Sequence, residues 1–289
     1  MLETIREILS YGFIVRALVV GLLVSLCAAL LGVSLVLKRY SMIGDGLSHV
    51  GFGTLAAATA LHLAPLSVAI PVSVATAFLL LRISGNSKIK GDAAIALIST
   101  GSMAVGVVII SMTTGMNTDV CNYLFGSILA MSLSDVRLSV VLAIVVLVLF
   151  TFFYSKIFAV TFDDDFARAT GVKSGLYNML IALLTAVTIV LGMRMMGALL
   201  ISSLTIFPAL TSMRLCKKFS TVTVCSVAVS VICFLIGVFS SYVYATPTGA
   251  SVVIVNIAAF ILFWILKFVP WARVRRLFGA KTDLSEKGA

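Results

Sequence analysis

Long apolar segments separated by short polar stretches dominate this chain and restrict it to one class of fold. A helix that crosses a bilayer needs about 20 mostly apolar residues, and the chain holds a series of segments near that length. The segments are residues 13–37, 44–63, 66–82, 92–113, 136–154, 176–193, 197–213, 219–242 and 249–268. Because backbone polar groups in lipid must be satisfied within the segment, such segments form α-helices. The sequence therefore predicts an all-α polytopic membrane protein.

The composition leaves no room for a separate soluble domain. Of the 289 residues, 61% are hydrophobic and only 11% are charged, whereas soluble domains carry about 25% charged residues. We expect residues 1–270 to form a single transmembrane domain, followed by a basic, polar cytoplasmic tail at residues 271–289.

The number of membrane crossings has two solutions. Two short segments contain a proline, Pro71 and Pro208, and a 17-residue helix spans about 25 Å, less than a hydrocarbon core of about 30 Å. Short, Pro-interrupted segments tend to lie near transport sites. If residues 176–213 form a broken or re-entrant pair, the chain crosses the membrane eight times; otherwise it crosses nine times.

The positive charges indicate the orientation. With nine alternating segments, one set of loops and the C-terminal tail carry nearly all of the 21 Lys and Arg residues. The exceptions are Arg6, Arg16, Arg137 and Arg194. The positive-inside rule then places the C-terminus in the cytoplasm and the N-terminus outside. The same rule accounts for the net charge of +10, and we expect no nucleic-acid partner.

Asp45 and His49 are the leading candidates for a functional site. Their spacing places both side chains on one helix face, with Cβ atoms about 5–6 Å apart. A carboxylate and an imidazole can bind a divalent metal ion, and ionisable residues within membrane segments are commonly functional. The structural alternative is that Asp45 favours the positive end of the helix dipole and that His49 is a satisfied polar group. Any remaining ligands must come from another segment or from water.

Two further polar residues are candidates for lining a transport path. Ser48 lies within the same stretch as Asp45 and His49, and Asp92 opens the segment at 92–113. Asp92 also suits the role of a helix N-cap.

A second candidate region, residues 161–175, lies on the side predicted to be cytoplasmic. Three aspartates precede a short amphipathic stretch, which suits the N-terminus of a helix, and a glycine follows that can end it. This region is either a solvated loop or a short helix that docks into a soluble partner. The candidate docking residues are Asp165, Phe166, Ala167, Arg168 and Gly171.

The chain lacks two motifs that would indicate an enzyme. It has no G-x-x-x-x-G-K-[ST] phosphate-binding loop and no H-E-x-x-H zinc-protease motif. We therefore expect a protein that is not an enzyme and that holds no permanently bound cofactor.

Several motifs, in order along nearly the whole chain, resemble those of the permease subunits of metal-ion ABC importers of the ABC-3 type, which serve zinc, manganese and iron. Residues 44–49 resemble the family's Gly-Asp-x-x-Ser-His motif, and residues 91–96 its Glu-Asp-x-Ala-Ile stretch. Residues 122–129 resemble its Leu-Phe-Gly-Asp-Ile-Leu element. Residues 162–171 and 206–211 resemble its Phe-Asp-x-Glu-Phe-Ala-Arg-x-x-Gly and Ile-Pro-Ala-Ala-Thr segments.

This resemblance implies an assembly and a role for each candidate region. Two copies of the subunit would form the path, a cytoplasmic ABC ATPase dimer would dock on them, and an extracellular or periplasmic metal-binding protein would deliver the ion. Asp45 and His49 would contact the transported ion, and residues 165–171 would form the ATPase-coupling helix. The continuation Ser-His-Val-Gly-Phe-Gly favours Zn²⁺, with Mn²⁺ or Fe²⁺ also compatible. The chain would reside in a bacterial inner or plasma membrane.

Two other functions stay open at this point. A stand-alone secondary metal or proton-coupled transporter would use Asp45 and His49 as a proton relay. A structural membrane subunit would have no transport path.

Overall fold

The computed structural model describes residues 12–86, 91–113, 126 and 132–268. All regular secondary structure within these residues is helical, which confirms the predicted all-α fold. The predicted tail at 271–289 lies outside them, as do most of residues 122–129.

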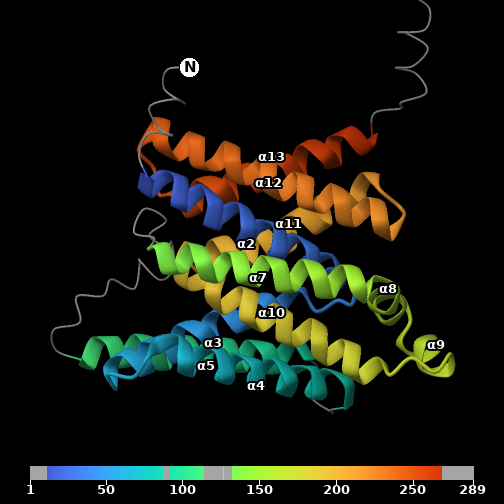
Figure 1. Cartoon of the computed structure of the whole chain (residues 1–289), viewed down its shortest axis with the longest axis horizontal. Helices are drawn as coiled ribbons and strands as arrows, with labels where there is room; N and C mark the ends of the chain where they lie inside the picture. Colours follow the sequence, from blue (N-terminus) through green and yellow to red (C-terminus); the bar gives the residue numbers. More distant parts are fainter. Residues whose placement is uncertain (1–11, 87–90, 114–125, 127–131, 269–289) are drawn as a thin grey trace, which may run out of the picture.

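Nine long helices form the body of the described chain, and they run roughly parallel or antiparallel to one another (Figure 1). They are α2 (Gly12–Leu37), α3 (Ser41–Ala60), α4 (Pro65–Asn86), α5 (Gly91–Met112), α7 (Leu133–Phe152), α10 (Ser174–Met196), α11 (Ala198–Leu215), α12 (Phe219–Tyr244) and α13 (Thr248–Phe268). Two short helices, α8 (Tyr154–Phe162) and α9 (Asp164–Ala169), lie at the right-hand end of the bundle in Figure 1.

The described residues form nine long helices, of which eight are long and apolar enough to cross a membrane. Residues 176–213 form two separate helices, α10 and α11, joined through Gly197, whose φ is +92°. Both are long and apolar enough to cross a membrane, so the re-entrant pair is not what the structure shows. Eight of the nine long helices meet that standard, and the exception is α3. The helix that carries Asp45 and His49 is therefore the least suited to contact lipid.

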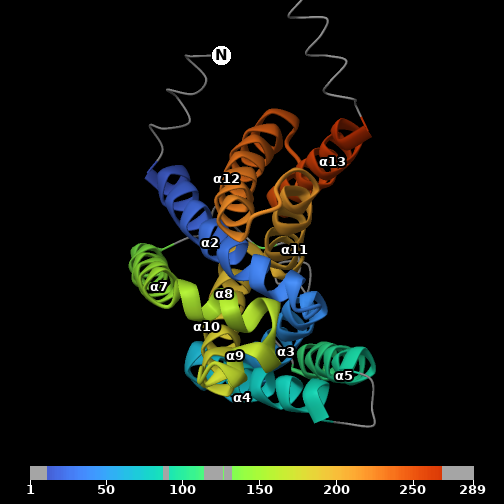
Figure 2. The same ribbon diagram turned by 90° about the vertical axis from the view of Figure 1, so that its right-hand side faces the viewer.

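Helix α3 is accommodated because other helices surround it. It packs against α4, α5, α10 and α11, and Figure 2 shows it between α10 and α5. At Gly53, an added Cβ would lie 2.4 Å from the carbonyl oxygen of Ser102 in α5. Close approach at small residues is how helices associate in membranes, where no hydrophobic force drives them together.

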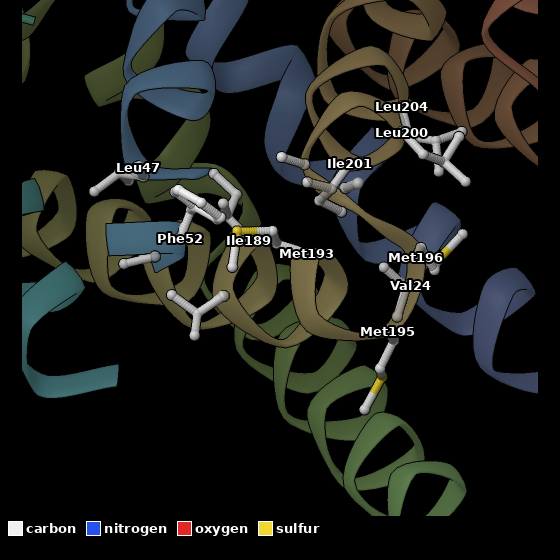
Figure 3. Packing of buried hydrophobic residues seen from close by; sticks show 14 of the residues in the cluster. Val24, Leu47, Phe52, Ile189, Met193, Met195, Met196, Leu200, Ile201 and Leu204 are labelled. Carbon is white, nitrogen blue, oxygen red and sulfur yellow. The ribbon is translucent and has the colours of Figure 1, made fainter. Parts of the chain in front are cut away.

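The core around α3 consists of large apolar side chains from α10 and α11. Ile189 and Met193 of α10 lie near Phe52 of α3, and Leu47 of α3 and Ile201 of α11 belong to the same cluster (Figure 3). Each of these side chains is at most 1% exposed. The helix that carries the candidate site is thus held on a rigid, closely packed support.

Side-chain contacts bring distant loops to one end of the bundle. Lys38 Nζ lies 3.6 Å from Asp164 Oδ1, and the rings of Phe158 and Phe219 are 5.3 Å apart. The loops after α2, between α7 and α10, and before α12 therefore share one end, as the predicted alternation requires. That this end faces the cytoplasm stays a prediction from the charge distribution.

Candidate metal path and coupling segment

Asp45 and His49 lie on one face of α3, as their spacing predicts. Nε2 of His49 is 3.6 Å from Oδ2 of Asp45, and the two side chains are 19% and 36% exposed, respectively. The helix begins at Ser41, three residues before the predicted start of the segment. The pair therefore lies in the second and third turns of α3, about one turn deeper than the sequence suggests.

The separation of the two side chains suits metal donors better than a hydrogen bond. A nitrogen–oxygen hydrogen bond measures about 2.7–3.2 Å. Two donors that each lie about 2.0–2.2 Å from one Zn²⁺ ion in a tetrahedral shell are about 3.4 Å apart. In addition, His49 Nδ1 is buried and has no hydrogen-bond partner among the described residues. The pair can thus supply two corners of a coordination shell.

Glycines on the other faces of α3 allow α5 and α10 to pack closely against it. A Cβ on Gly46 would lie 2.9 Å from Ile95 in α5, and one on Gly51 would lie 3.2 Å from Met193 in α10. Met42, one turn before Asp45 on the same face, is 52% exposed. The Asp45–His49 pair consequently lies on the partly exposed face of α3.

The described part of one copy supplies only two neighbouring donors at this place. Across the described ranges, no group of three or more His, Cys, Asp or Glu side chains is arranged to hold a metal ion. A weakly coordinated ion suits a transport path, because an ion must be able to leave each site that it enters.

The two other pathway candidates differ in what the structure says of them. Ser48 is fully buried, and its hydroxyl donates a 2.7 Å hydrogen bond to the carbonyl oxygen of Asp45. In the structure that hydroxyl is therefore hydrogen-bonded to the backbone of the helix that carries the pair. Asp92 is the second residue of α5, and its side chain lies outside the described part. The pathway roles of both residues stay predictions.

The predicted coupling segment contains a capped short helix, α9. The carboxylate of Asp163 accepts a 2.9 Å hydrogen bond from the backbone N–H of Phe166, which caps the N-terminus. Gly171 follows the helix with φ +82°, and the N–H of Val172 bonds to the carbonyl oxygen of Ala167 at 2.9 Å. These are features of a Schellman C-terminus, and they confirm that Gly171 ends the helix.

The short helix turns one face inward and another outward. Ala167 is fully buried, whereas Phe166 is 64% exposed and Phe162, at the end of α8, is 57% exposed. Asp165 and Arg168 are also exposed. Large aromatic side chains with charged neighbours are typical anchors of protein interfaces. The outward face of α8 and α9 can therefore serve as a docking surface.

The structure also shows a polar cluster that the sequence analysis missed. Lys38, Asn178 and Asp164 come from the end of α2, from α10 and from α9, and their side chains are hydrogen-bonded or ion-paired. From the sequence alone, Lys38 is only one of the basic residues that indicate the orientation in the membrane. Asn178 had one available signal, since it is an amide within the apolar segment 176–193.

The comparison with protein families decides the identity of the chain. Residues 10–267 match the profile of the ABC 3 transport family. The chain belongs to this family. The matched range contains both the Asp45–His49 pair and the coupling segment.

Individual relatives agree with this membership. The chain is 28% identical to the manganese transport system membrane protein MntC of Halalkalibacterium halodurans, over 89% of this chain and 88% of that protein. It is 29% identical to the high-affinity zinc uptake system membrane protein ZnuB of Haemophilus influenzae, over 85% and 94% of the two chains. The solved structure of PsaBC from Streptococcus pneumoniae in complex with Fab superimposes with a TM-score of 0.83 at 27% identity, and covers 95% of this chain and 98% of that one.

These findings fix the general role of the ABC 3 family chain. It is a multi-pass protein of the cell membrane, and its described residues include eight helices that are apolar and long enough to span it. It is a permease component of a transport system rather than an enzyme.

Proposed function

We propose that this chain is the membrane-spanning subunit of an importer that moves a divalent transition metal ion into the cytoplasm. A separate cytoplasmic ATPase would drive the transport. The observation that carries the proposal is the Asp45–His49 pair, with its 3.6 Å donor separation on the partly exposed face of α3. Relatives named for manganese and for zinc support it.

The donor chemistry defines a class of ion rather than one metal. A carboxylate and an imidazole bind Zn²⁺, Mn²⁺ and Fe²⁺, and affinity alone does not choose among them. The Ser-His-Val-Gly-Phe-Gly stretch makes Zn²⁺ the first ion to test, with Mn²⁺ and Fe²⁺ measured alongside it.

A second copy of the chain would complete the path. Because Met42, Asp45 and His49 lie on a face that one copy leaves partly open, a facing copy would bring a second donor pair to the same ion. A metal-binding protein on the outer side would deliver the ion to this site.

The docking surface on α8 and α9 would receive the ATPase. Phe162 and Phe166 are exposed where an apolar groove of the partner could accept them, and Asp165 and Arg168 would add charged contacts at its rim. Gly171 would fix where the helix ends and so set its orientation.

The test is the metal content of whole cells that lack the chromosomal gene. The cells would carry the wild-type gene, the Asp45→Ala/His49→Ala variant or the His62→Ala variant, and would grow in metal-depleted medium. Zn, Mn and Fe would be measured together. His62 is the control because it is the other histidine of the chain and is exposed in the loop after α3.

We expect one metal to fall without the gene and to recover with wild type and His62→Ala only. Equal recovery by the Asp45→Ala/His49→Ala variant would remove the pair from the path. Metal uptake that persists when the ATPase gene is deleted would instead support a stand-alone transporter.

A further inference from the structure

Three polar side chains from three elements meet at one point of the bundle end. Lys38, directly after α2, donates a hydrogen bond from Nζ to Oδ1 of Asn178 in α10. Asn178 Nδ2 donates in turn to Oδ1 of Asp164, the first residue of α9, at 3.1 Å. Lys38 Nζ and Asp164 Oδ1 are 3.6 Å apart. The amide thus bridges the ammonium and the carboxylate.

The chemistry of the cluster makes its members depend on one another. The Lys38 side chain is only 10% exposed, and a buried charge is costly unless it is paired and hydrogen-bonded. A side-chain amide can accept from an ammonium and donate to a carboxylate at the same time. Buried ion pairs add little net stability compared with apolar replacements. What this cluster provides is a fixed geometry between the three elements.

On one side the cluster holds the coupling helix. Asp164 also accepts a 3.0 Å hydrogen bond from Nη2 of Arg168. Arg168 Nε donates to Oγ of Ser174, the first residue of α10, at 2.8 Å. A displacement of α9 would therefore move the carboxylate to which Lys38 and Asn178 are bound.

On the other side the cluster is linked to α3, because the chain turns directly from Lys38 into the start of that helix. The N–H of Tyr40 bonds to the carbonyl oxygen of Leu35 at 2.8 Å, and Arg39 has φ +61°. These features form a Schellman-type turn, and this turn is the whole connection between Leu37 at the end of α2 and Ser41 at the start of α3. Only six residues separate Lys38 from Asp45 along the chain.

A small pocket lies beside the cluster and the first turns of α3. Its lining includes Lys38 and Asn178 together with Ile43 and Leu47 of α3, so the cluster and the first turns of α3 border the same space.

We infer that Lys38, Asn178 and Asp164 form a coupling junction that transmits displacement of α9 to α3 and so to Asp45 and His49. The inference rests on the proposed function, because it assumes an ATPase docked on α9 and an ion on the pair. The three residues are positioning residues: they touch neither the ion nor the partner.

The experiment measures the number of metal ions moved per ATP hydrolysed. The complete complex, chain plus ATPase, would be reconstituted in lipid vesicles with Zn²⁺, Mn²⁺ or Fe²⁺. The variants are Lys38→Met, Asp164→Asn, Asn178→Leu and the Lys38→Met/Asp164→Asn double variant. Lys156→Met is the matched control, since Lys156 is an exposed lysine of α8 at the same end of the bundle.

We expect each single variant to hydrolyse ATP at near the wild-type rate but to move at least about fivefold fewer ions per ATP, the lower end of typical coupling between sites. The double variant should fall no further, because contacting residues that act as a unit are non-additive. The Lys156→Met complex should keep the wild-type ratio. If Lys38→Met does not assemble, Asn178→Leu, which removes no charge, gives the same measurement.

Three results would contradict the coupling role of these residues. The first is an unchanged number of ions moved per ATP in the single variants, and the second is a joint loss of ATP hydrolysis and transport in an assembled complex. The third is a double-variant defect equal to the product of the two single-variant defects. Failure of the proposed function is seen separately, as a wild-type complex that hydrolyses ATP and moves none of the three metals.

Discussion

His49 presents Nε2 to Oδ2 of Asp45 at 3.6 Å while its other ring nitrogen, Nδ1, is buried with no hydrogen-bond partner in the described part of the chain. A buried polar atom without a partner is costly, and metal-binding histidines usually use both ring nitrogens. The pair offers two donor atoms, Nε2 of His49 and Oδ2 of Asp45, at a separation that fits one metal ion.

Single substitutions of this pair should impair transport without unfolding the chain. Asp45→Asn keeps the shape of the side chain and removes the charge, and His49→Gln removes the imidazole. Each should lower the initial rate of metal uptake into vesicles by about tenfold or more, since even partners of metal ligands typically contribute that much. His62→Gln serves as the control and should transport normally. Wild-type rates in both site variants would assign the pair a structural role.

The packing of α3 on α5 should tolerate no side chain at Gly53. An added Cβ would lie 2.4 Å from the carbonyl oxygen of Ser102, so Gly53→Ala must push the helices apart. Overpacking of this kind costs about 1–3 kcal/mol, and we expect a lower melting temperature in detergent.

Gly101→Ala is the control for this substitution on the partner helix. No described atom outside the adjoining backbone of α5 lies within 4 Å of a Cβ built at Gly101, and alanine is the better helix former by about 1 kcal/mol. Its melting temperature should equal or exceed that of wild type. Equal melting temperatures for wild type and Gly53→Ala would contradict the close approach of α3 and α5.

The outward aromatic side chains of the coupling region should anchor the ATPase. Phe166→Ala and Phe162→Ala each remove an exposed ring, and loss of an interface anchor costs about 2 kcal/mol or more. The retained ATPase should fall sharply when the tagged permease is purified from membranes. Tyr244→Ala, which removes a 75% exposed ring at the end of α12, should retain it fully. Normal retention by the Phe162→Ala/Phe166→Ala double variant would place the docking surface elsewhere.

The sequence could predict those features whose residues lie close together along the chain. The Asp45–His49 geometry follows from a spacing of four residues on one helix, so the pair could be proposed before the structure was known. The capped ends of α9 follow from Asp163 and Gly171 for the same reason. By contrast, Lys38 and Asn178 are 140 positions apart, and only the packing of α2 against α10 brings them together.

The first residue of α3 and the helices that surround it could also not be predicted from short sequence patterns. The helix begins at Ser41, a polar residue close after Lys38 and Arg39, whereas the apolar segment predicted from the sequence begins at residue 44. Its modest apolarity is stable only because α4, α5, α10 and α11 surround it, and a single sequence does not show which helices neighbour one another.

The junction lysine should give the chain a measurable pH dependence at alkaline pH. Burial lowers the pKa of Lys38 from its ordinary 10.5; Asp164 opposes this shift and Arg168 adds to it. The unfolded chain then holds this proton more tightly than the folded chain, so the lysine's contribution to stability rises with pH between the lowered pKa and 10.5. The melting temperature of wild type relative to Lys38→Met should therefore improve between about pH 7 and about pH 10. A difference that stays flat or shrinks as the pH rises would mean that Lys38 is not buried as a charged group.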